Sequence, residues 1–409
     1  MKKLLVIGKN WPEPQTTAAG YRMLQLLEIF QEDGYQVIFT CAGFKSAYSV
    51  DLRLLNIIEK EILLNDSSFD QYIKELRPDI VLYDRFMTEE QYSWRVKDNS
   101  PDTLHILDTE DLHFLRKARE VALKKGTDVD FYNDAAVREI AAIYRCDLNI
   151  IISKVEHGLL IDSFNIPEDK LVYIPFLYKN DKLKTSLLPK SFDERSNFVM
   201  IGNSLHQPNY DSILYLKNEI WPQIRNQLPD VEVHIYGAYQ NQSIEQLHNV
   251  KQGFIIKGFA ENSIETLQEY RLLLAPLRFG AGLKGKVFDA LHAATPVAMS
   301  QIAAEGMFNA KQEFGFIEND VDAYVSKVIS LYQNPEKWQE LSDSSLSILE
   351  NNYSYSAFAK ALLFKIPNLT NFKNTSLSKE DFFIKMLNFH SNSRYKYLSK
   401  WIGLKNNSD

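Results

Sequence analysis

The segment with the clearest chemical potential spans residues 275–291 and reads APLRFGAGLKGKVFDAL. An apolar run ends at Pro276, a glycine-rich turn follows, and a helical pattern begins near Gly285. Glycines let the backbone approach a phosphate, and a helix N-terminus offers unpaired N–H groups and a partial positive charge. Lys284 and Lys286 add full charges. The segment therefore predicts a pyrophosphate site at the carboxyl end of a strand.

The same segment contains the frame of a P-loop, with Gly280 and then Gly285-Lys286. A P-loop needs Ser or Thr at the next position to hold Mg²⁺, and the residue there is Val287. A P-loop also normally opens its domain, whereas only one or two strand patterns follow here. These points argue against a P-loop NTPase, and a purely structural glycine turn is the other alternative.

Two loops in the first half of the chain also follow strand patterns. Residues 9–22 form a long irregular loop that contains Gly20 and Arg22, for which the alternative is an ordinary loop with Arg22 on a solvated helix face. Residues 107–116 hold one His and three carboxylates within a short stretch, among them Asp111 and His113. Asp111 could instead cap the next helix. Arg116 and Arg119 could bind an acidic acceptor or pair with nearby carboxylates.

Short apolar runs that alternate with helical patterns must position these loops. Such alternation predicts an α/β fold with right-handed crossovers and a mainly parallel sheet. The alternation stops in a polar stretch at 179–196 and then restarts, which indicates two Rossmann-like domains in tandem. Strands are expected at 3–8, 35–40, 79–83, 104–107, 148–153, 170–175, 197–202, 231–237, 254–258, 271–276, 296–300 and 314–317. Helices are expected at 18–33, 112–125, 130–144, 210–227, 264–269, 285–294, 321–332 and 335–350.

Composition excludes several classes of protein. The chain has 409 residues, 45% hydrophobic and 24% charged, which is ordinary for globular domains. A net charge of −7 does not suit a general nucleic-acid binder. Cys41 and Cys146 lack the spacing of a disulfide framework or a metal site. No run is long enough for an export signal or a membrane span, so we expect a cytoplasmic protein.

The last part of the chain differs in character. From residue 373 onward it carries seven basic and three acidic residues, and its final helical stretch at 392–405 mixes basic with aromatic side chains. Such a helix can lie on an anionic membrane, which would make the protein membrane-associated. The alternative is a helix docked on the body of the protein.

Several motifs around the glycine turn occur in a characteristic order. The preceding ones are FVMIGN at 198–203 with His206, Pro208 and Asn209, VEVHIYG at 231–237 and GFIIKGF at 253–259, and the following ones are TPVA at 295–298 and AAEG at 303–306. With them, nearly the whole chain resembles GT-B glycosyltransferases similar to glycosyltransferase family 4 (group 1), in the variant with a Gly-Ala-Gly-x-Lys-x-Lys donor loop.

The resemblance implies a GT-B fold, with two Rossmann-like doubly wound domains facing each other across a cleft. The expected boundaries are 1–185 for the acceptor-side domain, 186–353 for the nucleotide-sugar domain, and 354–409 for helices that pack back on the first domain. In the family two glutamates stand eight positions apart. Asp289 occupies the second position here, whereas Ala281 occupies the first and cannot contact a sugar, a role that Glu305 would partly take over.

The resemblance also implies roles for individual residues. Backbone N–H groups from Gly280 to Gly282 with Lys286 would hold the departing diphosphate, and Asp289 would accept ribose hydroxyls. The expected catalytic residues are His113, Asp111, Lys286 and Arg278. The expected donor-binding residues are Gly202, Asn203, Gly237, Phe259, Gly280, Ala281, Gly282, Lys284, Lys286, Asp289 and Glu305. Gly20 and Arg22 would reach the donor phosphate and the acceptor.

The implied reaction moves a hexose from a nucleotide-diphosphate sugar, of UDP or GDP type, to an acceptor hydroxyl, with retention and without a metal or cofactor. The acceptor would be a glycan, a lipid-linked sugar or a protein, in bacterial surface-glycan assembly, and no nucleic acid is expected. Two alternatives stay open. One is a GT-B nucleotide-sugar epimerase, and the other is an inactive nucleotide-sugar-binding subunit, which the Ala281 departure favours.

Overall fold

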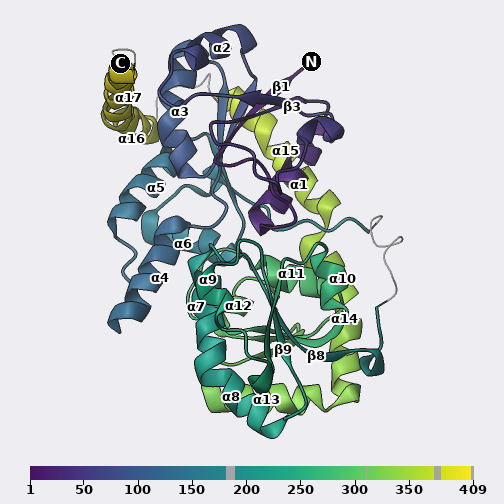
Figure 1. The fold of residues 1–409 in the computed structure, drawn as a ribbon. Helices are drawn as coiled ribbons and strands as arrows, with labels where there is room; N and C mark the ends of the chain where they lie inside the picture. The colour runs from purple at the N-terminus through teal and green to yellow at the C-terminus, as the bar shows by residue number, and fades with distance from the viewer. Residues whose placement is uncertain (181–188, 310, 373–378, 407–409) are drawn as a thin grey trace.

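A computed structural model describes residues 1–180, 189–309, 311–372 and 379–406. It contains two α/β domains, each built around one parallel sheet, that lie one above the other in Figure 1. Most strand residues are buried because helices cover both faces of each sheet, as doubly wound folds require. The predicted pair of doubly wound domains is therefore confirmed.

The first domain has a seven-stranded sheet in the order β3-β2-β1-β4-β5-β6-β7. Every recorded strand pair in it is parallel, and the order reverses between β1 and β4, which places a switch point there. The strands are β1 Lys3–Gly8, β2 Gln36–Cys41, β3 Ile58–Glu61, β4 Ile80–Asp84, β5 Leu104–Asp108, β6 Leu148–Ile151 and β7 Leu171–Tyr173. The α-helices are α1 Ala18–Glu32, α2 Ser68–Leu76, α3 Phe86–Asn99, α4 His113–Lys125, α5 Asp134–Arg145 and α6 Lys154–Phe164.

The second domain has a six-stranded sheet in the order β10-β9-β8-β11-β12-β13, again parallel with a switch point, here between β8 and β11. Its strands are β8 Ser196–Ile201, β9 Val233–Tyr236, β10 Phe254–Gly258, β11 Tyr270–Ala275, β12 Val297–Met299 and β13 Gly315–Ile317. Its helices are α7 Gln207–Tyr215, the π-helical η5 Leu216–Ile220, α8 Trp221–Gln227, α9 Gln242–Glu245, α10 Ser263–Leu267, α11 Gly285–His292, α12 Gln301–Ala304, α13 Val321–Tyr332 and α14 Pro335–Tyr353.

The C-terminal part returns to the first domain. Helix α15 (Tyr355–Phe372) places Leu362 and Ile366 in the same apolar cluster as the first sheet. Helices α16 (Lys379–Leu387) and α17 (Ser393–Asn406), joined by the π-helical turn η7 (Asn388–Asn392), then pack against α3 and α5. None of the described helices is long and apolar enough to cross a membrane.

The chain crosses between the domains twice, and the two crossings pair with each other. The backbone N–H of Tyr178 donates to the carbonyl of Tyr353 at 2.6 Å, and the N–H of Tyr355 donates to the carbonyl of Tyr178 at 2.9 Å. These bonds form an isolated parallel bridge between Tyr178 and Ser354. The two crossings are therefore held together at the boundary of the domains.

The structure confirms the expected strands to within a few residues. The predictions did not include β3, α2, α3, α6, α9 or α12, most of which are short, exposed or rich in charged residues. Cys41 and Cys146 are both buried and free, in agreement with the absence of a disulfide framework.

Candidate active site

The carboxyl ends of both sheets face each other, and their loops touch at two glycines of the donor loop. A Cβ at Gly285 would lie 2.4 Å from the Cβ of Ala18 at the start of α1. A Cβ at Gly282, where φ is +64°, would lie 2.8 Å from the Cβ of Asp111. Because a side chain does not fit at such distances, these glycines allow the two domains to approach this closely.

Lys286 lies in the first turn of α11, beside the loop that follows β8. Its Nζ donates to Oδ1 of Asn209 at 2.8 Å, and Nδ2 of Asn209 donates to the carbonyl of Asn203 at 2.9 Å. A Cβ at Gly202 would lie 2.7 Å from Asn209, and one at Gly237 would lie 2.2 Å from the carbonyl of Gly202. These predicted donor residues are thus gathered around one ammonium group.

The electrostatic surroundings of Lys286 favour an anionic ligand. Burial, with a smaller contribution from the charge of Lys284, lowers the pKa of Lys286 to about 7. Its hydrogen-bond partner among the described residues is a neutral amide. An ammonium group that is desolvated and lacks a countercharge gains most from a bound phosphate.

Lys284 has a different role from the one predicted. Its side chain is buried, and its Nζ donates to the carbonyls of Ala281 at 3.2 Å and Gly282 at 2.6 Å. Burial lowers its pKa, and the carboxylates of Glu305 and Glu156 oppose that change. Lys284 therefore holds the glycine turn in shape, because its donors are directed at the turn's own carbonyls.

The backbone N–H of Gly282 also differs from the prediction that it holds the diphosphate. It donates to Oε1 of Glu156 at 2.7 Å, and that oxygen also accepts the N–H of Leu112 at 3.1 Å. Glu156 belongs to α6 of the first domain, is fully buried, and its Oε2 has no hydrogen-bond partner among the described residues. Burial raises its pKa. Sequence reasoning missed this carboxyl group because α6 was not predicted.

Glu305 forms the most extensive ion pair between the domains. Arg119 of α4 donates from Nη1 and Nη2 to its two oxygens, each at 2.8 Å, and also to the carbonyl of Gly280 at 2.8 Å. Both side chains are 16% exposed. Arg119 therefore pairs with a carboxylate of the other domain, and the predicted sugar contact of Glu305 competes with this ion pair.

His113 and Asp111 lie together at the start of α4. Nε2 of His113 is 3.5 Å from Oδ1 of Asp111, and Arg116 pairs with the other oxygen of Asp111. Burial, followed by the charges of Arg85 and Lys9, lowers the pKa of His113 to about 3, so the imidazole is neutral near pH 7. Asp111 does not cap the helix.

Glu139 of α5 caps α4 instead. Its two oxygens accept the backbone N–H groups of His113 at 3.1 Å and Phe114 at 2.9 Å. These bonds satisfy donors that a helix N-terminus leaves unpaired, and they fix the backbone of His113.

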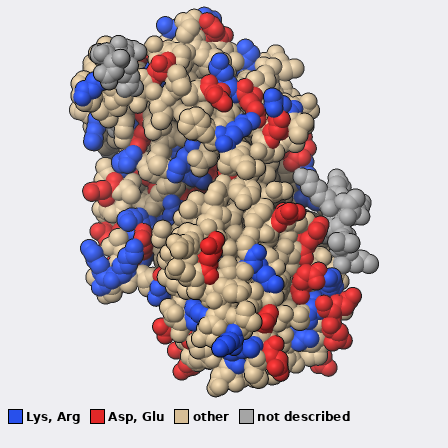
Figure 2. All heavy atoms as spheres, viewed as in Figure 1, with Lys and Arg blue, Asp and Glu red and all other residues tan. Residues whose placement is uncertain are grey.

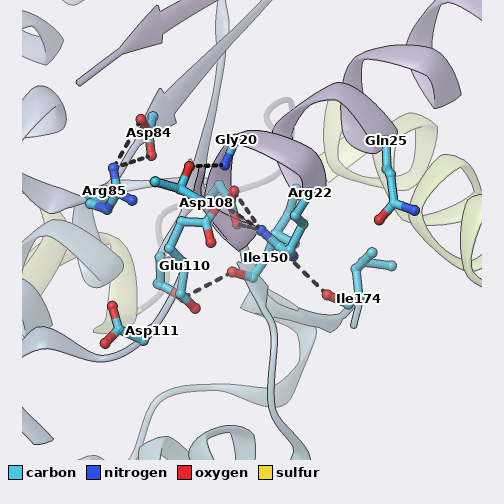
Figure 3. A network of polar contacts seen from close by, with 12 residues as sticks. Gly20, Arg22, Gln25, Asp84, Arg85, Asp108, Glu110, Asp111, Ile150 and Ile174 are labelled. Carbon is cyan, nitrogen blue, oxygen red and sulfur yellow. Dashed lines mark hydrogen bonds and ion pairs between the residues drawn. The ribbon is translucent and has the colours of Figure 1, made fainter. Parts of the chain in front are cut away.

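Arg22 is directed into the first domain. It is fully buried, and its Nη1 donates to both oxygens of Asp108 at 2.7 Å while its Nη2 donates to the carbonyl of Ile174 at 3.1 Å (Figure 3). Burial and the charge of Asp108 raise the pKa of the adjacent Glu110. A buried guanidinium cannot reach a ligand, so Arg22 positions α1 and its N-terminal Gly20.

Arg278 is also placed differently from the prediction. It pairs with Asp211 and lies 4.8 Å from the ring of Tyr215, and it lines a hollow of about 430 Å³ with Ser300 and Glu318. Its side chain is therefore directed at α7, and its charge is already neutralised by a carboxylate.

Asp289 and Phe259 are the two residues predicted to contact the nucleoside. Burial raises the pKa of Asp289 to about 6, and the same carboxyl group contributes to the raised pKa of Tyr21 from α1. The ring of Phe259 is 4.9 Å from that of Tyr48, which is in turn 5.3 Å from Tyr239. This aromatic group combines residues of both domains. No cluster of three or more His, Cys, Asp or Glu side chains suited to a metal was found in the described ranges.

The chain is similar to known proteins in both sequence and structure. Residues 195–334 match the model of the family Glycosyl transferases group 1. A Klebsiella pneumoniae protein described as an uncharacterized 44.6 kDa protein in cps region is 22% identical over 394 residues, which are 86% of this chain and 97% of the relative.

Two solved proteins share the fold at low identity. The structure of TarM matches with a TM-score of 0.69 and 11% identity, over 91% of this chain and 99% of that chain. A Staphylococcus aureus TarM mutant in complex with UDP is matched over only 58% of its length, with a TM-score of 0.56 and 15% identity over 74% of this chain. Anabaena Alr3699/HepE in complex with UDP-glucose matches with a TM-score of 0.63 and 10% identity, over 90% of this chain and 100% of that chain.

The glycine turn, the basic residue at the start of α11 and the two facing parallel sheets agree with these similarities. The family match is confined to the second domain, and the structural matches extend over both. The chain has the fold of the GT-B glycosyltransferases, and its second domain matches group 1 of the glycosyl transferases.

Proposed function

We propose that the chain transfers a hexose from a nucleotide-diphosphate sugar, of UDP or GDP type, to a hydroxyl group of a glycan, lipid-linked or protein acceptor. HepE was solved with UDP-glucose and TarM with UDP, and the Klebsiella relative belongs to a cps region. These similarities support a role in bacterial surface-glycan assembly.

The observation that carries the proposal is the placement of Lys286. Its ammonium group stands at the N-terminus of α11, where the helix adds partial positive charge, and its hydrogen-bond partner among the described residues is the neutral Asn209. A diphosphate would supply the missing anion. As the bond from the sugar C1 to the diphosphate breaks, charge grows on the phosphate oxygen, and Lys286 would stabilise it.

The proposed reaction proceeds with retention and without a metal ion. The bond between C1 and the leaving diphosphate oxygen breaks, and the acceptor oxygen forms its bond to C1 from the same face. The acceptor proton passes to the leaving phosphate oxygen. Asp289 would accept ribose hydroxyls, Phe259 would lie against the base, and the neutral His113, supported by Asp111, would contact the sugar.

The first test compares Lys286→Ala with Lys327→Ala, a control on the exposed face of α13 that pairs with Glu318. We expect the Lys286 variant to lose at least about 100-fold in turnover of the donor, the usual cost of one charge partner in a transition state. The control should keep its turnover. Equal turnover in both variants would overturn the assignment.

Two further measurements separate the alternatives. A thermal-shift series with UDP, GDP, ADP and their sugars identifies the donor, because a ligand that binds only the native state raises the melting temperature. Incubation with donor alone distinguishes an epimerase, which would change the sugar without an acceptor. Proton NMR of the product then reports whether the anomeric configuration is retained.

A further inference from the structure

The C-terminal part of the chain ends in one uninterrupted helix. Helices α16 and α17 are continuous through the π-helical turn η7, and we call residues 379–406 the C-terminal helix. It lies along the outer side of the first domain, against α3 and α5 (Figure 1). The C-terminal helix therefore contacts the first domain through one of its sides.

Polar contacts fix the rotation of this helix on the body. Arg95 donates to Oγ of the buried Ser399 at 2.9 Å, and Lys97 donates to Oδ1 of Asn388 at 2.8 Å. Lys396 pairs with Asp98 at 2.6 Å. Because all of these partners belong to α3, the residues on the far side of the helix point to solvent.

That solvent-facing side is apolar. The spacings 382/386/389 and 397/401/404 place side chains on one helix face, one turn above another. The exposed fractions of the large apolar side chains run from 39% to 71%, and these residues are Phe382, Phe383, Met386, Phe389, Tyr397, Leu398, Trp401 and Leu404. An apolar stripe that runs along a whole helix marks an interaction surface, whereas single exposed apolar residues do not.

Basic residues accompany the apolar stripe. The C-terminal helix carries six basic and two acidic residues, although the whole chain has a net charge of −7. Lys385, Arg394, Lys400 and Lys405 are exposed, and Nζ of Lys405 lies 4.2 Å from the ring of Trp401. Figure 2 shows Lys and Arg side chains gathered along this edge of the first domain.

We propose that this face of the C-terminal helix lies in the surface of an anionic lipid membrane. Aromatic rings and long basic side chains suit the boundary between headgroups and acyl chains, since the apolar parts enter the lipid while the charges stay in water. Each exposed basic residue adds about five-fold to binding to an anionic surface. A second copy of the chain would present the same positively charged face. The charge of this face therefore favours an anionic membrane over a second copy as its partner.

Vesicle co-sedimentation of the full chain tests the proposal. The chain should sediment with vesicles of phosphatidylcholine and phosphatidylglycerol, much less with phosphatidylcholine alone, and less as salt increases. The double variant Phe389→Asp, Trp401→Asp should lose at least about ten-fold in vesicle binding. Leu346→Asp, a control at a 46% exposed position of α14, should bind like the parent.

Other outcomes would overturn the proposal. Equal vesicle binding by the double variant and the parent would exclude this face, and so would failure of the parent to bind anionic vesicles. Concentration-dependent self-association that the double variant loses, without vesicle binding, would assign the face to a second copy instead. If the double variant keeps the melting temperature and donor turnover of the parent, its substitutions alter only the surface of the helix and not the folded structure.

Discussion

A lowered pKa at Lys286, in the turn proposed to hold the diphosphate, has a consequence for binding. Lys286 is about half deprotonated near pH 7 in the free protein because burial disfavours its charge. A bound diphosphate favours the ammonium form, so the pKa of Lys286 rises in the complex. Binding above pH 7 therefore requires the uptake of a proton from solvent.

This proton uptake gives a pH dependence with a definite sign. We expect the affinity for UDP to fall as pH rises from 7.5 to 9.5, approaching ten-fold per unit, because the fraction of charged Lys286 falls. Titration calorimetry in buffers of different ionisation enthalpy measures the uptake directly. Lys286→Arg, whose charge does not titrate there, should show the weaker slope. The same slope in parent and variant would contradict the role of Lys286.

The value of sequence reasoning differs sharply between residues. The position of Lys286 and Asp289 at the start of a helix could be predicted because a strand, a glycine turn and a helix follow one another locally and each has its own pattern. The ion pair of Arg22 with Asp108 could not, since its members stand 86 positions apart and a charged residue on a helix normally indicates solvent. The contacts of Glu156 could not be predicted from the sequence for the same reason.

At the scale of elements, the contact between the N-termini of α1 and α11 determines how closely the domains approach. Gly285 lacks a Cβ where Ala18 has one, and a Cβ there would lie 2.4 Å from that of Ala18. Helix α11 carries Lys286 one residue further on, so the contact also sets where the ammonium group stands relative to the first domain.

A reciprocal pair of substitutions tests this contact. Gly285→Ala should separate the two helices and lower donor turnover by about ten-fold or more, since displacements near 1 Å carry such costs. Adding Ala18→Gly should restore much of the turnover by removing the opposing methyl group. Gly158→Ala in α6, where a Cβ would meet nothing within 4 Å, is the control. No recovery in the double variant would mean that the clash is not the cause.

Helix α3 shows why some elements escaped prediction. Its charged residues are buried because each has a partner on another element: Glu89 pairs with Arg145, Glu90 with Arg138, and Arg95 with Asp70. Pattern analysis assigns charged positions to solvent, so a helix that is buried through ion pairs has no clear apolar stripe. Strand β3 was missed for the opposite reason, because most of it is exposed.

At the scale of the whole molecule, the ion pair between Arg119 and Glu305 links the two domains. Arg119→Ala and Glu305→Ala should each weaken UDP binding about five-fold, and the double variant should be little worse than either, because one lost partner already breaks the link. Calorimetry of the four proteins gives the coupling free energy. The pair of the exposed Lys117 with Glu120 should show a smaller coupling. Additive losses would show that the two residues act separately.

The paired crossings at Tyr178 and Tyr353 have a mechanical consequence. With a single connection, the domains could rotate about three axes. Two connections that are hydrogen-bonded to each other at 2.6 Å and 2.9 Å restrict this motion to one hinge axis through the crossings. Opening would then be a rotation about this axis that separates Arg119 from Glu305. Product release would be governed by a single coordinate with a fixed path.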